Sequence, residues 1–280
     1  MIRRTFAEAA RDRITSSAAS LAFHWFLAIF PAAIAALGVV GLVGLSAGQL
    51  RSLVHGVSVI LPAQMSQVID EALRNPVGGA GGRAEVVVGV LVALWSSVES
   101  MSALQVALDV AYEVPSDRSF LRRRLWALPL VAVTIVLGGA AFALLVLGDP
   151  VRALLPSSAA LAQGAFDGAW EAIRWAGALL LVMVLLSAYY TVGANHGRFR
   201  WRWLSAGAVA AAAGWMGASA GFSFYLDNFG HESRTYGAFA GVAVLLLWLF
   251  VTAVAVLAGA ELNCELARPH PAAAEGGADR

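Results

Sequence analysis

The sequence has little charge and one cysteine, and each shortage excludes a class of protein. Charged residues make up 13% of the 280 residues and hydrophobic residues 59%, with a mean hydropathy of +0.73. A soluble globular chain is far less apolar. The single cysteine, Cys264, excludes an internal disulfide and a thiolate metal cluster. A net charge of +1 gives no reason to expect a nucleic-acid partner.

Long apolar stretches are abundant instead. A membrane-spanning helix needs about 20 mostly apolar residues, and six stretches come close to or meet this length. They cover residues 20–44, 86–108, 126–148, 175–192, 204–226 and 236–260. The first is too long to be a cleavable signal peptide. We therefore predict an all-α, polytopic membrane protein with six transmembrane helices.

The arginines predict how the chain is oriented. All 19 basic residues are arginine, which is most simply explained by a GC-rich genome. Thirteen of them lie before the first span, in the second and fourth connections and in the tail. Since basic connections stay in the cytoplasm, both termini are predicted to be cytoplasmic, in the bacterial cytoplasmic (inner) membrane.

Three regions follow from this division. Residues 1–19 are predicted to form an amphipathic cytoplasmic N-terminus, and residues 20–266 the six-helix transmembrane domain. Residues 267–280 are rich in proline, alanine and glycine and predict a disordered cytoplasmic tail. Apolar residues at helical spacing on both sides of Pro62, between residues 50 and 73, predict two short amphipathic helices on the outer face.

The second span carries acidic residues where lipid would penalise them. Helical steps of three and four residues connect Trp95, Glu99, Ser102, Val106, Asp109 and Glu113. An ionised carboxylate facing lipid costs about 2.5–3.5 kcal/mol, so Glu99 is predicted to face other helices or a wet cavity. Two interpretations stay open for Glu99: an ion pair that locks helices together, or a proton-coupling or substrate-contacting site. For Asp109, near the headgroups, the structural interpretation leads.

Other polar residues lie in the same half of the membrane. They are His24 in the first span, and Glu261 and Asn263 at the end of the sixth. For each of these, a structural hydrogen bond or a solvated helix end is the favoured interpretation. Together with Glu99, Ser102 and Asp109 they form a candidate polar pathway, provided that the first, second and sixth helices are neighbours. Pro31 is predicted to kink the first span because it lacks a backbone N–H.

Two arginine clusters are candidates for binding lipid headgroups. They are Arg122, Arg123 and Arg124 in the second connection and Arg198, Arg200 and Arg202 in the fourth. Arginine suits phosphate recognition. The simpler explanation is that cytoplasmic arginines orient any membrane protein.

The fifth span shows a pattern of small residues. Gly207, Ala211, Gly214, Ala218 and Gly221 repeat at steps of four and three. Such residues allow helices to approach closely, so the pattern predicts helix packing; a smooth groove for an acyl chain would use the same surface.

Several motifs occur in order along the chain. They are "FP" at Phe30 and Pro31, "LW" at Leu94 and Trp95, "NFG" at 228–230, "TYG" at 235–237 and "GAELN" at 259–263. Singly most are ordinary, but their order and spacing resemble the YihY/BrkB family of bacterial inner-membrane proteins, from about residue 12 to residue 266. The sequence departs from the family pattern at Glu99, where a basic residue is common.

The resemblance implies a six-helix inner-membrane protein. Family members were once labelled ribonuclease BN, and some have been linked to export of lipid or lipid-linked envelope material. Metal-dependent RNA cleavage needs clustered ligands, whereas the five histidines, His24, His55, His196, His231 and His270, lie in separate segments. We therefore reject ribonuclease activity and predict a protein that is not an enzyme and has neither metal nor cofactor.

Two functional hypotheses remain. The first is a transporter or flippase of lipid or lipid-linked envelope material, whose partners are membrane lipids, including an anionic lipid substrate, and no nucleic acid. The second is a non-transporting scaffold or envelope-assembly factor, which binds partner proteins. Neutralising Glu99 would stop a proton-linked transporter and would be tolerated by a scaffold. We favour transport.

Overall fold

The computed structural model describes residues 14–43, 82–115, 118–145, 160–195, 205–229 and 237–268, and the regular secondary structure within these ranges is helical. The α-helices are α2 (Ile14–Val43), α5 (Gly82–Ala111), α6 (Phe120–Val133), α8 (Ala160–Ala188), α9 (Ala206–Phe229) and α10 (Gly237–Ala267). The predicted all-α class is therefore confirmed.

Five of the described helical segments are long and apolar enough to cross a membrane. They are Ile14–Ala32, Val87–Ala111, Phe120–Leu145, Gly168–Gly193 and Val242–Ala267. Each overlaps one of the predicted spans, which confirms a polytopic membrane protein. The predicted span 204–226 coincides with α9, a helix of 24 residues that is not among these five. The count of six transmembrane helices stays a prediction.

Two of the spans contain a turn of π-helix. The segment η1 (Thr134–Gly138) follows α6, and the helix continues beyond it to residue 145. The segment η2 (Tyr189–Gly193) ends α8. The hydroxyls of Thr134 and Tyr189 lie 2.7 Å apart, so a hydrogen bond joins the two wider turns. Such turns are rare and leave the helix locally wider than an α-helix.

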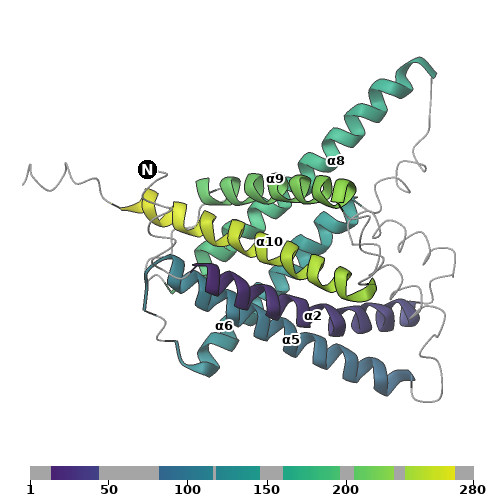
Figure 1. The fold of residues 1–280 in the computed structure, drawn as a ribbon. Coiled ribbons are helices and arrows are strands. Elements are labelled where there is room, and N and C mark those ends of the chain that lie inside the picture. Colours follow the sequence, from purple (N-terminus) through teal and green to yellow (C-terminus); the bar gives the residue numbers. More distant parts are fainter. Residues whose placement is uncertain are drawn as a thin grey trace, which may run out of the picture.

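The helices form a bundle in which α2 lies between α10 and α5 (Figure 1). Helix α2 packs against α5 and α10, and α10 also packs against α9 and α5. Helix α6 packs against α5, and α8 packs against α9 and η1. The first, second and sixth predicted spans are thus neighbours, as the candidate pathway requires.

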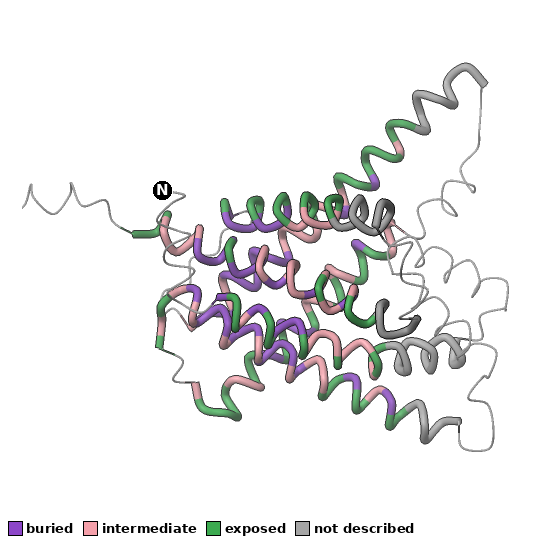
Figure 2. The backbone as a smooth tube through the Cα atoms, in the orientation of Figure 1, coloured by how far each residue is buried: buried purple, intermediate pink, exposed green. Residues whose placement is uncertain are grey.

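The buried core lies toward one end of the bundle (Figure 2). This end contains the start of α2, the end of α5 and the end of α10. Its largest fully buried apolar side chains are Leu21, Leu104, Leu108, Leu130 and Leu257. Many apolar side chains elsewhere point outward, such as Leu91 and Ile135, which are 61% and 62% exposed. Outward apolar side chains are expected where lipid is the solvent.

Small residues bring α9 and α10 into close contact in this core. A Cβ atom added at Gly207 would meet the Gly259 carbonyl oxygen and the Asn263 side chain, and one added at Gly259 would meet Tyr190 and Ala211. The Tyr190 hydroxyl also donates to the Val256 carbonyl at 2.7 Å. The small-residue pattern predicted from the sequence therefore serves helix packing at Gly207 and Ala211.

Some predicted features differ from the structure or lie outside it. The first helix begins at Ile14, so residues 14–19, which the sequence assigns to the N-terminal region, are helical and continuous with the span. Helix α2 includes Pro31 and continues to Val43, and the predicted kink at Pro31 stays a prediction. The predicted helices between residues 50 and 73, and residues 269–280 of the predicted tail, lie outside the described residues.

Candidate functional site

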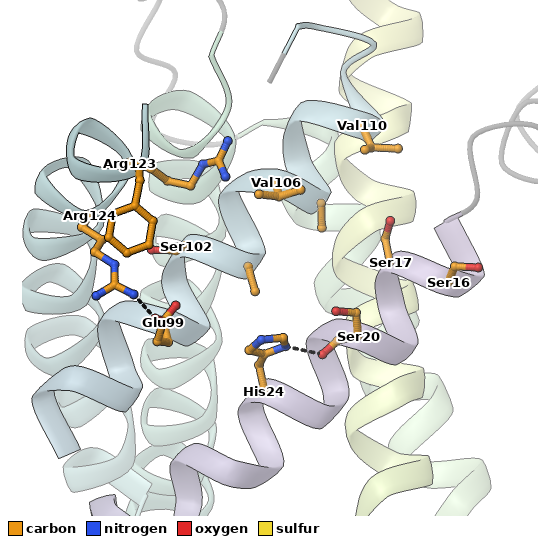
Figure 3. Close-up of a pocket in the computed structure, with 13 residues that line it drawn as sticks. Ser16, Ser17, Ser20, His24, Glu99, Ser102, Val106, Val110, Arg123 and Arg124 are labelled. Carbon is orange, nitrogen blue, oxygen red and sulfur yellow. Dashed lines mark hydrogen bonds and ion pairs between the residues drawn. The ribbon is translucent and has the colours of Figure 1, made fainter. Parts of the chain in front are cut away.

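A cavity of about 600 Å³ lies between α2, α5 and α6. Its lining residues are Ser16, Ser17, Ser20 and His24 from α2; Glu99, Ser102, Ala103, Val106, Ala107 and Val110 from α5; and Phe120, Arg123 and Arg124 from α6. Hydroxyl, imidazole, carboxylate and guanidinium groups therefore share one cavity within helices that are otherwise apolar. Figure 3 shows these side chains.

Helix α2 supplies a row of hydroxyl groups and one imidazole. Ser16, Ser20 and His24 follow at steps of four residues, which places them on one face of the helix. The His24 Nδ1 atom lies 2.8 Å from the Ser20 carbonyl oxygen. Because a carbonyl only accepts, Nδ1 carries the hydrogen, and in the neutral ring Nε2 is then an acceptor. Ser100 on α5 donates to the His24 carbonyl at 3.1 Å and so ties the two helices together.

Helix α5 divides into a cavity face and a core face. Glu99, Ser102 and Val106 line the cavity. Val98, Met101, Leu104 and Leu108, which follow the same helical spacing, are buried in the core. The Ser102 hydroxyl donates to the Val98 carbonyl at 2.7 Å, so its oxygen still has acceptor capacity toward the cavity.

Arg124 is held by three side chains. Its guanidinium forms an ion pair with Glu99 (Figure 3). The guanidinium carbon also lies 4.2 Å from the centre of the Trp95 ring and 4.1 Å from that of Phe120. Such contacts stabilise a cation that has left bulk water. The sequence predicted that Glu99 faces other helices or a wet cavity, and in the structure it lines the cavity and pairs with Arg124 of α6.

The start of α6 packs beside the interior of α5, about two turns before the end of that helix. Arg118 donates to Gln105 at 3.4 Å, and Arg124 pairs with Glu99, so equal steps along the two antiparallel segments match each other. Phe120 is then level with about residue 103, roughly 12 Å from the end of α5 at Ala111. The short connection thus brings basic side chains to a depth that a surface loop would not reach.

The six predicted headgroup arginines separate into three groups. Arg123 and Arg124 line the cavity, whereas Arg122 is exposed and is not part of the lining. Arg198, Arg200 and Arg202 lie outside the described residues.

Asp109 belongs to a different network at the same end of the bundle. Its side chain is fully buried, and its Oδ1 atom accepts the Asn195 backbone N–H at 2.8 Å. Arg118 donates to the carbonyls of Gly193 and Ala194 at 3.0 and 3.2 Å. Gly193 is the last residue of η2 and Ala194 follows it, so Arg118 binds the carbonyls at the end of this helix. Asp109 and Arg118 therefore hold the end of η2 against α5.

Asn263 and Glu261 also lie away from the cavity wall. Asn263 accepts the Gly207 backbone N–H at 2.8 Å and donates to Ser205 at 3.0 Å, and the Ser205 hydroxyl accepts the Ala208 N–H at 3.1 Å. Together they cap the first turn of α9. Glu261 is buried in α10, 3% exposed. Of the candidate pathway, the structure brings together His24, Glu99 and Ser102, and it places Asp109, Glu261 and Asn263 elsewhere.

Tyr112, just beyond α5, adjoins the cap of α9. Its hydroxyl accepts from Asn263 at 3.4 Å. Burial raises the pKa of Tyr112 to about 12, so the phenol stays protonated at neutral pH.

Sequence reasoning missed the serines of α2 and the aromatic residues around Arg124. Ser16 and Ser17 were assigned to the region before the first span. The four-residue spacing of Ser16, Ser20 and His24 is a signal that would have placed them on one face. Nothing in the sequence brings Trp95 and Phe120 to the same guanidinium, because that contact depends on how α6 packs against α5.

Comparison with known proteins places the chain in a family. The sequence profile of the family described as "Virulence factor BrkB" matches residues 5–280. The protein belongs to the BrkB family. This confirms the resemblance seen in the sequence motifs, and the BrkB-family protein is an integral, multi-pass membrane protein.

The relatives include proteins named for very different properties. The ribonuclease-like protein YfkH of Bacillus subtilis is 30% identical over 251 residues, which cover 90% of this chain and 89% of YfkH. A UPF0761 membrane protein of Alteromonas mediterranea is 26% identical and covers 91% of this chain and 83% of its own length. The chain spans 56% of a UPF0761 membrane protein of Alkalilimnicola ehrlichii, also at 26% identity. No solved structure matches significantly.

The BrkB-family protein shows no metal-ligand cluster in the part of the chain that the structure describes. No three His, Cys, Asp or Glu side chains among those residues are grouped in a way that could hold a metal ion.

Proposed function

We propose that this protein is a transporter or flippase that moves a phosphate-bearing lipid between the leaflets of the bacterial cytoplasmic membrane, without chemical change to the lipid. The observation that carries the proposal is the cavity, in which Arg123 and Arg124 join a row of serine hydroxyls. Arginine and hydroxyl groups are the usual partners of a phosphate. A volume of about 600 Å³ is ample for a headgroup.

The composition of the lining supports an anionic group, because two arginines, Arg123 and Arg124, and the α2 serines lie beside a single carboxylate, Glu99.

The position of the cavity supports movement across the membrane. Glu99 lies three turns before the end of α5, roughly 18 Å along the helix, so the lining reaches well into a hydrocarbon layer about 30 Å thick. With both termini in the cytoplasm, as the arginine distribution predicts, the cavity serves the cytoplasmic leaflet. A headgroup bound there has completed part of its crossing among polar side chains.

Reconstitution in lipid vesicles tests this proposal. The purified protein is placed in vesicles with a trace of fluorescent phosphatidylglycerol, and a membrane-impermeant reductant removes fluorescence from the outer leaflet. In vesicles with wild-type protein, nearly all of the labelled lipid is expected to become accessible to the reductant, whereas about half of it is accessible in vesicles without protein. Arg123→Gln should slow the exchange about tenfold, because a charge-assisted hydrogen bond is lost.

A matched control separates headgroup binding from surface charge. Arg268→Gln removes an arginine from the end of α10, outside the cavity, where it pairs with Glu113 and Glu265. This variant should exchange lipid at the wild-type rate. If the folded wild type leaves half of the label protected, transport is refuted, and the scaffold hypothesis becomes the one to test by crosslinking.

A further inference from the structure

We infer that the cavity opens sideways into the lipid layer and holds a whole lipid, with the headgroup in the cavity and an acyl chain on an apolar track along α2 and α5. This rests on the proposed function and adds the side from which the substrate enters. The faces of the two helices support it, because each changes from polar to apolar at the same level of the bundle.

One face of α2 carries exposed side chains of both kinds. Ser16 and Ser20 line the cavity and are exposed, and both lie within the candidate span Ile14–Ala32. Leu27 lies eleven residues after Ser16 and seven after Ser20, about 20° from each around the helix axis. Leu27 is exposed, as is Phe30 in the next turn. The cavity therefore opens on the side of α2 on which apolar side chains face outward.

The face of α5 that lines the cavity shows the same change. Val92 and Val88 lie seven and eleven residues before Glu99, each about 20° from it around the axis. Both valines are exposed, and so is Trp95. From Glu99 to Val88 this face is about 16 Å long, comparable with one leaflet of a hydrocarbon layer about 30 Å thick. It is long enough for an acyl chain.

A hydrogen bond sets the two faces at matching levels. Ser100 on α5 donates to the His24 carbonyl on α2 at 3.1 Å, and the two helices run in opposite directions (Figure 1). The polar lining residues of both helices lie at this level or toward the start of α2, and the exposed apolar residues lie beyond it. The apolar track consists of Leu27, Phe30, Val88, Val92 and Trp95.

Helix α6 forms the other side of the opening. Phe120 lines the cavity and is 72% exposed, so its ring stands at the edge. The Arg124 side chain is only 15% exposed, and its guanidinium contacts the rings of Phe120 and Trp95. A cation that faced lipid would be costly. Serine hydroxyls and an aromatic ring therefore border the opening, while the guanidinium is covered.

This arrangement favours a lipid over a soluble phosphate. A soluble anion needs polar groups that are open to water, and it gains nothing from exposed apolar side chains in line with them. A lipid uses both parts, because its headgroup contacts the serines and arginines while its acyl chain stays among apolar side chains.

Photolabelling of the purified protein in a maltoside detergent, which carries no phosphate, tests the lateral site. The probe is phosphatidylglycerol with a diazirine in one acyl chain, and labelled peptides are identified by mass spectrometry. Labelling of residues 88–95 should exceed that of Ile135 and Val136, which are similarly exposed on η1, by about tenfold, because headgroup contacts hold the probe at the track. Diacylglycerol with the same photoreactive chain lacks the phosphate and should label both segments alike. Equal labelling of the two segments by the phosphatidylglycerol probe would overturn the inference.

Variants that fill the cavity connect the headgroup to the track. Ser20→Trp on α2 and Val106→Trp on α5 each place an indole in the cavity, and each should reduce phosphatidylglycerol labelling of residues 88–95 to the level of η1. Ala19→Trp is the matched control, because Ala19 is exposed beside Ser20 and does not line the cavity; its labelling should equal that of wild type. Unchanged labelling in either filled variant, eluting as a single species, would overturn the inference even if the other failed to fold.

Two further arms separate the possible failures. Soluble glycerol phosphate at the concentration of the probe should leave the labelling unchanged, because it lacks the acyl chain; displacement would mean that the cavity takes a free phosphate and would overturn the lateral site. Labelling of residues 88–95 at the level of η1, in protein that still exchanges lipid in vesicles, would overturn the inference and leave the proposed function standing. Tenfold labelling in protein that exchanges no lipid would support the lateral site and refute transport.

Discussion

At the scale of single residues, Glu99 and Asp109 show how two carboxylates on one helix acquire different roles. Glu99 lies beside Arg124 and opens into a cavity. Asp109 is fully buried and accepts a backbone N–H from Asn195. The first pairs with Arg124 and lines the cavity, and the second holds two helices together.

Asp109→Ala should therefore destabilise the protein and leave lipid exchange unchanged. Loss of the carboxylate removes the acceptor of the part-buried Asn195 backbone N–H, which costs up to about 1–3 kcal/mol. The change in stability is measured by heating the protein in detergent and recording how much of the monodisperse elution peak remains at each temperature. Asp109→Asn keeps one acceptor oxygen and should cost less. A wild-type transition temperature in Asp109→Ala would contradict the structural role.

The ion pair between Glu99 and Arg124 predicts energetic coupling. Glu99→Gln and Arg124→Gln should each destabilise the fold, and the double variant should cost less than the sum of the two. The coupling free energy should be about 1 kcal/mol, as for polar pairs within membranes. Arg124→Gln should be the worse single change, since it also removes contacts with Trp95 and Phe120.

The exposed ion pair of Glu113 and Arg268 provides the comparison for this double-mutant cycle of Glu99 and Arg124. Both side chains are more than one third exposed, and such pairs couple weakly, by about 0–1 kcal/mol. Additive effects at Glu99 and Arg124, together with stronger coupling at the exposed pair, would contradict the assignment.

Residue spacing could predict the environment of Glu99 but not that of Asp109. Steps of three and four residues place side chains on one face of any helix, whatever surrounds it. The pattern therefore predicted that Glu99 and Ser102 share a face, and both line the cavity. Ten residues at 100° each leave Asp109 about 80° away from Glu99 around the axis, because such steps average less than 3.6 residues. There it meets the end of η2, a contact that depends on tertiary packing.

At the scale of helices, Gly207 and Gly217 on α9 give a matched pair for testing helix packing. A Cβ at Gly207 would enter the Gly259 backbone and Asn263, whereas one at Gly217 meets nothing within 4 Å. Gly207→Ala should therefore destabilise the protein by about 1–3 kcal/mol. Gly217→Ala should be neutral or stabilising by up to about 1 kcal/mol.

The transition temperatures of thermal unfolding of the two alanine variants test this prediction. A lower transition temperature only in Gly207→Ala confirms that the small residues serve close packing of α9 on α10. An unaffected Gly207→Ala would mean that the helices separate easily, which would favour a groove over a fixed interface.

Helix positions could be predicted from hydropathy, whereas their depths could not. Each predicted span overlaps a helix because a membrane requires a long apolar segment with satisfied backbone groups. The start of α6 was placed at the surface with its arginines, but Arg118 and Arg124 pair with Gln105 and Glu99 well inside α5. The number of arginines in a connection predicts on which side of the membrane it lies, but not how far along α5 the start of α6 packs.

At the scale of the whole molecule, the bundle has one closely packed end. This end combines the buried core, the cavity and the networks of Asp109 and Asn263. Polar side chains in a membrane protein need partners, so the packed end is where a headgroup site can be built without exposing charge to lipid.

The orientation of the molecule decides which leaflet the cavity serves, and cysteine labelling tests it. In a Cys264→Ser background, Pro115→Cys marks the connection before α6, and Gly168→Cys marks the first residue of the candidate span Gly168–Gly193, at the opposite end from η2. Both positions are exposed. A membrane-impermeant maleimide added to spheroplasts should label position 168 and should reach position 115 only after lysis, because the connection with Arg118 is predicted to be cytoplasmic. The reverse pattern would place the cavity in the outer leaflet, and the prediction that it serves the cytoplasmic leaflet would be wrong.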